Sequence, residues 1–215
     1  MDVWRLDLAA PSDDMSWLLT ADERERAERF ARLEDRDRWT QARGVLRMLL
    51  GRYAGADPMA LRFVTGAHGK PALSGGPQAL SFNLSHSGDI TLYAFALGCA
   101  VGIDVELPRP GIDMLGVAAR VLGADATRRL GALDGATREK EFLRAWVRHE
   151  ATLKCRGTGL GTAQAVMDSS SVWITELNVG RAGAAALAID GQSREIRCWA
   201  RGGTSPRLGF GAGEV

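Results

Sequence analysis

Two acidic residues, Asp104 and Glu106, stand two positions apart in a segment that otherwise has the pattern of a buried strand. Side chains alternate between the two faces of a strand, so both carboxylates point to the same side. Their neighbours Val101, Ile103 and Val105 are apolar, and carboxylates in such surroundings are costly unless a cation or a donor pairs with them. Because Mg²⁺ prefers a few carboxylates with water and substrate phosphates, the pair indicates a metal site, with a solvated strand end as the alternative.

A third carboxylate, Glu150, and an ammonium group, Lys154, lie four positions apart in a segment with helical spacing. Residues four apart are neighbours on a helix, where such a pair is usually a surface ion pair worth about 0.2–0.5 kcal/mol. Trp146 lies one turn before Glu150, so the pair continues the apolar face of the predicted helix and points inward. A carboxylate and an ammonium group beside a metal suit phosphoryl chemistry, with the surface ion pair as the alternative.

A polar segment at residues 82–89 precedes a predicted strand and contains Ser85 and His86. Hydroxyls, a histidine and backbone donors next to glycine can cradle a phosphate, although a plain turn has a similar composition. A Ser/His hydrolase is a further alternative, but the sequence has no G-x-S-x-G motif and no readable triad order. Lys70, in a Gly-Lys-Pro turn, offers another cation or is a solvated loop lysine.

Composition and motif context exclude several other classes of protein. The glycine-rich segment 157–161 follows a predicted helix rather than a strand, which excludes a dinucleotide-binding loop, and no Walker A motif occurs. The net charge of +1 gives the chain no strong attraction for nucleic acid or for a membrane surface. No apolar stretch approaches the roughly 20 residues that span a bilayer.

The cysteines Cys99, Cys155 and Cys198 are far apart and form no C-x-x-C pair. We therefore expect neither a zinc site nor a disulfide framework. The first residues are acidic and lack the apolar core of a secretory signal, so we expect a cytoplasmic protein.

Apolar spacing predicts the elements that carry these groups. A helix is expected after a capping box at Thr20 and Glu23. Further helices are predicted at 36–53, 115–122 and 138–155. Strands are predicted at 61–64, 91–97, 100–106, 172–174, 185–189 and 196–200. Gly98 and Cys99 form a loop that suits a type II′ turn, so the strands on either side of it are predicted to pair antiparallel.

Both halves of the chain run helices first and strands later, and the second repeats one spacing of the first. Trp39 precedes Arg43 as Trp146 precedes Glu150, which hints at a duplicated unit. We divide the chain into an N-terminal half at 1–106, a C-terminal half at 107–201 and a glycine-rich tail at 202–215 that we expect to be flexible.

Taken together, these segments resemble the 4'-phosphopantetheinyl transferases of the Sfp type. Four segments occur in the family's order: Gly-Lys-Pro at 69–71, Phe-Asn-Leu-Ser-His-Ser at 82–87, Gly-Ile-Asp-Val-Glu at 102–106, and residues 146–160. The last is similar to the family pattern W-x-x-K-E-A-x-x-K-x-x-G-x-G-L. The resemblance covers about residues 30–160, and the ordered set is specific although each segment alone is weak.

The resemblance implies an α+β fold of two similar halves related by pseudo-twofold symmetry, with the active site between them. It implies that Asp104, Glu106 and Glu150 bind Mg²⁺ together with the diphosphate of coenzyme A. A serine of an apo acyl or peptidyl carrier protein then attacks the β-phosphate, and 3',5'-ADP leaves. Glu150 is the expected base, acting directly or through a water molecule.

The resemblance also implies roles for the basic and hydroxyl side chains. Lys154 would stabilise charge on the diphosphate of the coenzyme. Ser85 and His86 would contact the coenzyme's phosphates, with Lys70 and Arg43 as further contacts. We expect a monomer that binds coenzyme A and a carrier protein, and neither nucleic acid nor membrane.

One residue departs from the family pattern, because His149 stands where the family usually has lysine. We expect His149→Lys to lower the KM for coenzyme A. Two alternative functions are a non-catalytic coenzyme A or nucleotide-binding module and a metal phosphohydrolase. The carboxylates together with Lys154 argue against the first, and the lack of a second metal cluster argues against the second.

Overall fold

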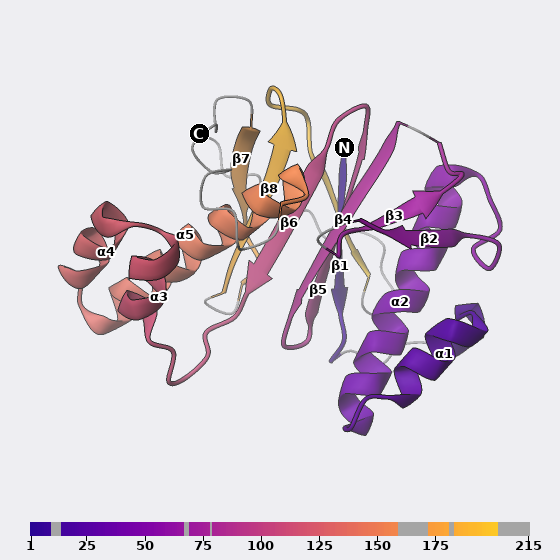
Figure 1. Cartoon of the computed structure of the whole chain (residues 1–215), viewed down its shortest axis with the longest axis horizontal. Helices are drawn as coiled ribbons and strands as arrows, with labels where there is room; N and C mark the ends of the chain where they lie inside the picture. Colours follow the sequence, from indigo (N-terminus) through magenta and orange to yellow (C-terminus); the bar gives the residue numbers. More distant parts are fainter. Residues whose placement is uncertain (10–13, 67–68, 78, 159–171, 181–182, 202–215) are drawn as a thin grey trace.

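Two helices of 22 residues, α2 (Leu33–Ala54) and α5 (Gly135–Arg156), have the apolar spacing of core helices, and each lies on its own sheet (Figure 1). The structure, a computed structural model, describes residues 1–9, 14–66, 69–77, 79–158, 172–180 and 183–201. The first sheet has the strand order β4 (Leu80–Ser87), β5 (Ile90–Leu97), β1 (Asp2–Asp7) and β9 (Arg197–Arg201). The second has the order β6 (Val101–Glu106), β8 (Ala184–Asp190) and β7 (Val172–Leu177).

Shorter elements complete the two halves. The first half adds a 3-10 turn η1 (Ser16–Leu18), α1 (Ala21–Glu28) and a small antiparallel sheet of β2 (Arg62–Thr65) and β3 (Pro71–Ser74). The second half adds α3 (Met114–Val121) and α4 (Ala124–Gly131) before α5. Among the described residues, no helix is both long and apolar enough to cross a membrane.

Each long helix buries one face against one sheet. In the first half, Leu46 and Leu49 of α2 pack in a cluster with Tyr93 and Phe95 of β5. In the second half, Phe142, Val147 and Ala151 of α5 pack in a cluster with alanines of β8. The prediction of an α+β fold with two similar halves is therefore confirmed.

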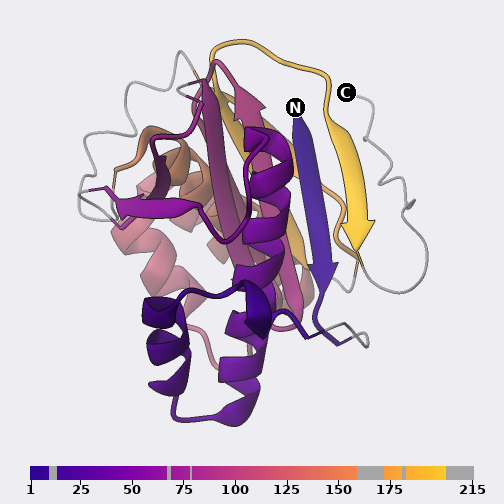
Figure 2. The same cartoon turned by 90° about the vertical axis from the view of Figure 1, so that its right-hand side faces the viewer.

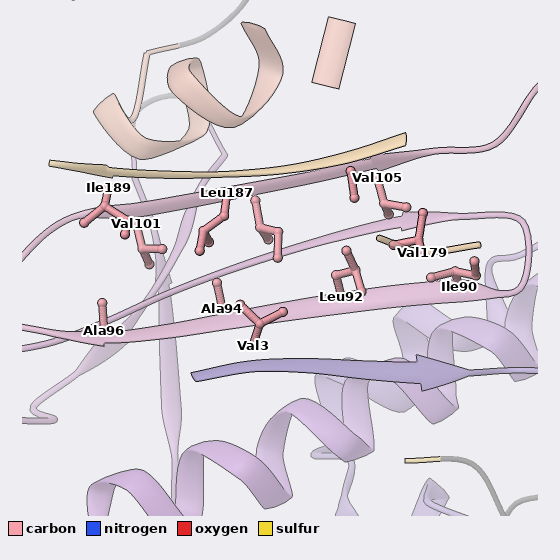
Figure 3. Packing of buried hydrophobic residues seen from close by; sticks show 12 residues of the cluster. Val3, Ile90, Leu92, Ala94, Ala96, Val101, Val105, Val179, Leu187 and Ile189 are labelled. Atoms are coloured by element: carbon pink, nitrogen blue, oxygen red, sulfur yellow. The ribbon is translucent and has the colours of Figure 1, made fainter. Parts of the chain in front are cut away.

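The two sheets pack face to face through a third apolar cluster (Figure 3). The first sheet contributes Val3, Leu92 and Ala94, and the second contributes Val101 and Leu187, all of them at most 2% exposed. The two halves therefore share one apolar cluster, to which both sheets contribute. Burial of these side chains removes apolar area of both sheets from water, which stabilises the packing of the halves against each other.

The predicted hairpin between the strands at 91–97 and 100–106 is wrong. β6 pairs antiparallel with β8, with Ile103 opposite Leu187, while β5 pairs with β4 and β1. Gly98 has the expected positive φ of 71°, but the turn moves the chain from one sheet to the other. The reason is that the apolar sides of β5 and β6 are buried against each other across the core, so the two strands do not pair edge to edge.

The division that we drew at residue 106 stays a prediction, and sheet membership offers a second way to divide the chain. By sheet membership the first half ends at β5, because β6 belongs to the second sheet. Moreover, β9 returns from the second half and lies parallel to β1 at the edge of the first sheet (Figure 2). Asp2 holds this edge, since its carboxylate accepts hydrogen bonds from Arg197 Nε at 2.8 Å and Tyr53 Oη at 2.7 Å. The predicted tail at 202–215 lies outside the described residues.

The predicted long helices and strands are confirmed, with ends that differ by a few residues. The capping box is also present, because the Thr20 N–H donates to Glu23 Oε2 at 3.0 Å. Sequence reasoning missed β1, β3, α4 and above all β4, whose polar residues we interpreted as a phosphate cradle or a turn. Residues 80–87 form an eight-residue strand in a hairpin with β5, and the assignment of Ser85 and His86 to a phosphate stays a prediction.

β6 and α5 pack closely at Gly102. A Cβ atom at this position would lie 2.1 Å from the carbonyl oxygen of Ala151 and 2.3 Å from the backbone nitrogen of Cys155. Real Cβ atoms essentially never come this close to another atom, and both contacted atoms belong to backbone. Glycine therefore lets the helix lie directly on the strand that carries Asp104 and Glu106.

We predict that Gly102→Ala separates α5 from β6 and lowers the free energy of unfolding by about 1–3 kcal/mol or more, the range for overpacking. Urea denaturation of both proteins measures this change. Gly131→Ala is the matched control, because a Cβ there meets nothing within 4 Å. Equal stability of the Gly102→Ala variant and the parent would contradict the close packing described above.

Candidate active site between the two halves

A groove of about 430 Å³ lies where β4, β6 and α5 meet. The sequence-predicted residues Ser85, His86, Asp104, Glu106, Glu150 and Lys154 line it together with Leu84 and Trp146. Because β4 belongs to the first sheet and β6 and α5 to the second half, the groove is shared between the halves. The structure thus brings together six of the eight predicted site residues.

Side chains of β4, rather than backbone pairing, join this strand to β6. The Asn83 Oδ1 accepts a hydrogen bond from the Ile103 N–H at 2.8 Å. Further along, the Ser87 hydroxyl donates to Glu106 Oε2 at 2.9 Å and accepts from the Leu107 N–H at 3.0 Å. Alternate residues of β4 therefore set the position of β6 relative to β4 through side-chain hydrogen bonds.

Lys154 contacts residues of both halves within the groove. Its Nζ lies 2.6 Å from Asp104 Oδ1 and 3.0 Å from the Ser85 hydroxyl oxygen. The Ser85 hydroxyl also donates to Asp104 Oδ1 at 2.7 Å. Since the side chain of Asp104 is only 5% exposed, water screens this ion pair weakly.

Two carboxylate oxygens in the groove have no protein partner within the part of the chain that the structure describes. They are Asp104 Oδ2 and Glu150 Oε1, and both are buried. Burial raises the pKa of Glu150 above its ordinary value, and the charges of Asp104 and Glu106 add to the rise while Lys154 opposes it. Such unpartnered buried oxygens are costly in a native protein, and they mark a place for a cation or a donor.

The donor set suits a hard cation, but the carboxylates are not gathered around one point. Among the described residues, no three His, Cys, Asp or Glu side chains are arranged as a metal cluster. Asp104 Oδ1 already accepts a hydrogen bond from Lys154 Nζ, and Arg109 Nη2 lies 3.1 Å from Glu106 Oε2. The two unpartnered oxygens nevertheless fit Mg²⁺, which takes only one or two carboxylates together with waters and phosphates.

The structure does not bring Arg43 to the groove lining. Its Nε donates to Glu23 Oε1, and its guanidinium group lies 3.8 Å from the ring centroid of Phe63. Glu23 also accepts from the buried Arg47 at 2.6 Å, so the arginines and Glu23 join α1 to α2. The assignment of Arg43 to a coenzyme phosphate stays a prediction, and its described contacts are structural.

Lys70 does not line the groove either. Its Nζ donates to two backbone carbonyl oxygens, those of Val101 at 2.9 Å and Lys154 at 2.7 Å. Burial lowers the pKa of this ammonium group. Lys70 therefore contacts the two elements that carry the site without lining the groove, and its assignment to a coenzyme phosphate also stays a prediction.

His149, the departure from the family pattern, is not among the lining residues, and its ring centroid lies 6.3 Å from that of Trp146. Burial lowers its pKa, which favours the neutral imidazole. Gly157 ends α5 with a φ of 68°, as its place in the last motif requires, while the remainder of that motif at 159–160 lies outside the described residues. Sequence reasoning missed Asn83 and Ser87, although polar residues at every second position of 82–87 were a signal of a strand.

Comparisons with known proteins agree with this architecture. A family profile described as "4'-phosphopantetheinyl transferase superfamily" matches residues 100–201, and one described as "4'-phosphopantetheinyl transferase, N-terminal" matches residues 11–97. The two matches meet at the Gly98 turn, where the chain passes from one sheet to the other.

Three relatives carry names of the same kind. The chain is 33% identical over 214 residues to 4'-phosphopantetheinyl transferase HetI of Nostoc sp., which covers 92% of this chain and 90% of the relative. It is 29% identical to a 4'-phosphopantetheinyl transferase of Bacillus subtilis, over 76% of this chain and 70% of the relative. It is 31% identical to 4'-phosphopantetheinyl transferase AcpT of Escherichia coli, over 67% of this chain and 68% of the relative. The chain therefore belongs to the 4'-phosphopantetheinyl transferase superfamily and is a transferase.

Proposed function

We propose that the groove between the halves transfers the 4'-phosphopantetheine group of coenzyme A to a serine of an apo carrier protein, as in the Sfp type of the family. The observation that carries this proposal is the joint presence of Lys154 and the carboxylates of Asp104, Glu106 and Glu150 in one groove. Cations and carboxylates gathered in one groove suit the charge that develops in phosphoryl transfer.

Asp104, Glu106 and Glu150 are the residues that would hold Mg²⁺. The unpartnered oxygens of Asp104 and Glu150 support this assignment, because both are buried and belong to groove residues. When bound, the cation would neutralise part of the charge on the coenzyme diphosphate.

The residues of the chain divide the remaining work. Lys154 stabilises negative charge on the diphosphate, while Ser85 and His86 bind its phosphate oxygens. The serine oxygen of the carrier forms a bond to the β-phosphorus, the bond from that phosphorus to the bridging oxygen breaks, and 3',5'-ADP leaves. Glu150 takes the serine proton on a carboxylate oxygen, and its raised pKa makes it a stronger base than an exposed glutamate.

We propose that the monomer is the active unit. We also propose a cytoplasmic enzyme that binds neither nucleic acid nor membrane. The boundary at residue 106 is replaced in this proposal by the Gly98 turn, because the halves then coincide with the sheets.

We predict magnesium-dependent transfer of labelled coenzyme A to an apo carrier protein, and loss of at least about 100-fold in rate for Asp104→Asn, since even outer partners of a metal are worth 10–100-fold. A panel of apo acyl and peptidyl carriers provides the assay. Asp125→Asn, on the surface of α4, is the control and should keep full activity. Binding of coenzyme A without transfer to any carrier would favour a binding module, and release of phosphate without a carrier would favour a hydrolase.

We predict that Glu150→Gln raises the melting temperature at neutral pH in magnesium-free buffer while it lowers activity. The pKa of Glu150 is higher in the folded state than in the unfolded state, so above the folded pKa the charged carboxylate costs stability. Below the unfolded value of about 4.3 both states are protonated and the cost disappears. Melting curves between about pH 4 and about pH 8 should therefore show a gain that grows with pH.

Glu139→Gln, on the same helix and outside the groove, is the control and should leave the melting temperature unchanged. If Glu150→Gln melted at a lower temperature than the parent at neutral pH, the Glu150 carboxylate would have a stabilising partner in the folded protein. That outcome would remove the support that its unpartnered oxygen gives to the metal assignment.

A further inference from the structure

Lys70 reaches from the first half of the molecule to the two elements that carry the carboxylates. It precedes β3, which lies in the right-hand half of Figure 1, whereas α5 lies in the left-hand half. Its Nζ donates at 2.9 Å to the carbonyl oxygen of Val101, the first residue of β6, and at 2.7 Å to that of Lys154 near the end of α5. One ammonium group therefore bonds to both elements at once.

We propose that Lys70 is a positioning residue that holds α5 against β6. It thereby sets the distance from Asp104 on the strand to Glu150 and Lys154 on the helix. The inference rests on the proposed function for its kinetic consequence, but the contact itself is independent of it. Lys154 links the two roles, because its carbonyl oxygen accepts from Lys70 while its side chain bonds to Asp104.

The backbone beneath Lys70 is held in place. The Gly66 N–H donates to the carbonyl oxygen of Lys70 at 2.9 Å, and the Gly69 N–H donates to that of Gly66 at the same distance. Gly69 has a φ of 82°, in the left-handed region that favours glycine. These bonds connect the described residues Gly66, Gly69 and Lys70 between β2 and β3, so the lysine stem starts from a hydrogen-bonded backbone in the first half.

The carbonyl of Lys154 is a strong acceptor because of its place in the helix. It lies within the last turn of α5, where carbonyl groups carry partial negative charge, and it accepts one long backbone hydrogen bond, from the Gly157 N–H at 3.3 Å. A cation at this end is favourable. In the part of the chain that the structure describes, the hydrogen-bond partners of Lys70 Nζ are the carbonyl oxygens of Val101 and Lys154, which carry partial negative charge.

A second contact lies at the same junction. Gly102 follows Val101 and brings β6 so close to Ala151 and Cys155 that a Cβ has no room. Gly102 sets how near the strand and the helix can come, and Lys70 resists their separation at the adjacent residue. Together the two contacts determine the distance across which Lys154 meets Asp104.

Lys70→Met tests the proposal, because methionine keeps much of the stem and loses the ammonium group. We expect kcat to fall about 10- to 100-fold, since a displacement of about 1 Å can cost about 100-fold in rate. The KM for coenzyme A should change less than about threefold, because a displaced catalytic pair lowers the chemical step without removing a substrate contact. Lys70→Arg keeps charge and donors and should recover part of the kcat.

Hydrogen exchange provides a readout that does not depend on activity. In Lys70→Met the amides of residues 151–158 should exchange faster than in the parent, because the end of α5 opens more often. Lys140→Met, at an exposed lysine on the same helix, is the matched control and should change neither exchange nor kinetics.

Three results would overturn the inference. A rise of about tenfold or more in the KM for coenzyme A with unchanged kcat would make Lys70 a coenzyme contact instead. Unchanged kcat, KM and exchange would leave it without a role in the site. If Lys70→Met does not fold, the Lys70→Arg variant takes its place. Hydrogen exchange equal to that of the parent together with a kcat about 10-fold or more below that of the parent would then contradict the inference, because the helix end would be held while activity was lost. Absence of transfer by the unmodified enzyme would contradict the proposed function alone, because faster exchange in Lys70→Met would still support the contact.

Discussion

The contact between the Lys154 ammonium group and the Asp104 carboxylate is the interaction on which the arrangement of the groove depends. The nitrogen and oxygen lie 2.6 Å apart, and Asp104 is nearly inaccessible to water. A buried charge pair of this kind is not a reliable source of stability, because desolvation can exceed the attraction. Its value lies in geometry, since losing either partner would leave an uncompensated charge in the interior.

That geometry requires three elements from two halves, and each is fixed by a different kind of contact. β4 is joined to β6 by polar side chains, of which Asn83 and Ser87 are examples. α5 lies on β6 because Gly102 has no side chain. The sheets themselves are held by apolar burial on both faces, so the polar groove lies at the margin of a large common core. A site built in this way gains precision from regular elements rather than from loops.

The sequence allowed β6 and α5 to be predicted, because their apolar periods continue on both sides of the polar residues. The periods placed Asp104 with Glu106, and Glu150 with Lys154, on buried elements. That the two pairs share one site was implied by the resemblance to the Sfp-type transferases. The hairpin prediction failed for a related reason. An apolar strand has the same pattern whether its neighbour lies beside it in a sheet or faces it across a core, and only the face-to-face arrangement applies to β5.

Long cationic side chains were harder to place than carboxylates, because their ends lie several bonds from the backbone that the pattern describes. Arg43 continues the apolar spacing of α2, yet its partner is Glu23, which the capping box had already placed at the start of α1. Lys70 stands in a short turn, yet its ammonium group contacts the carbonyl oxygen of Lys154, which lies 84 residues later in the sequence. Local spacing gives the direction in which such a residue leaves the backbone. What it meets is decided by the packing of the opposite half, which no local pattern contains.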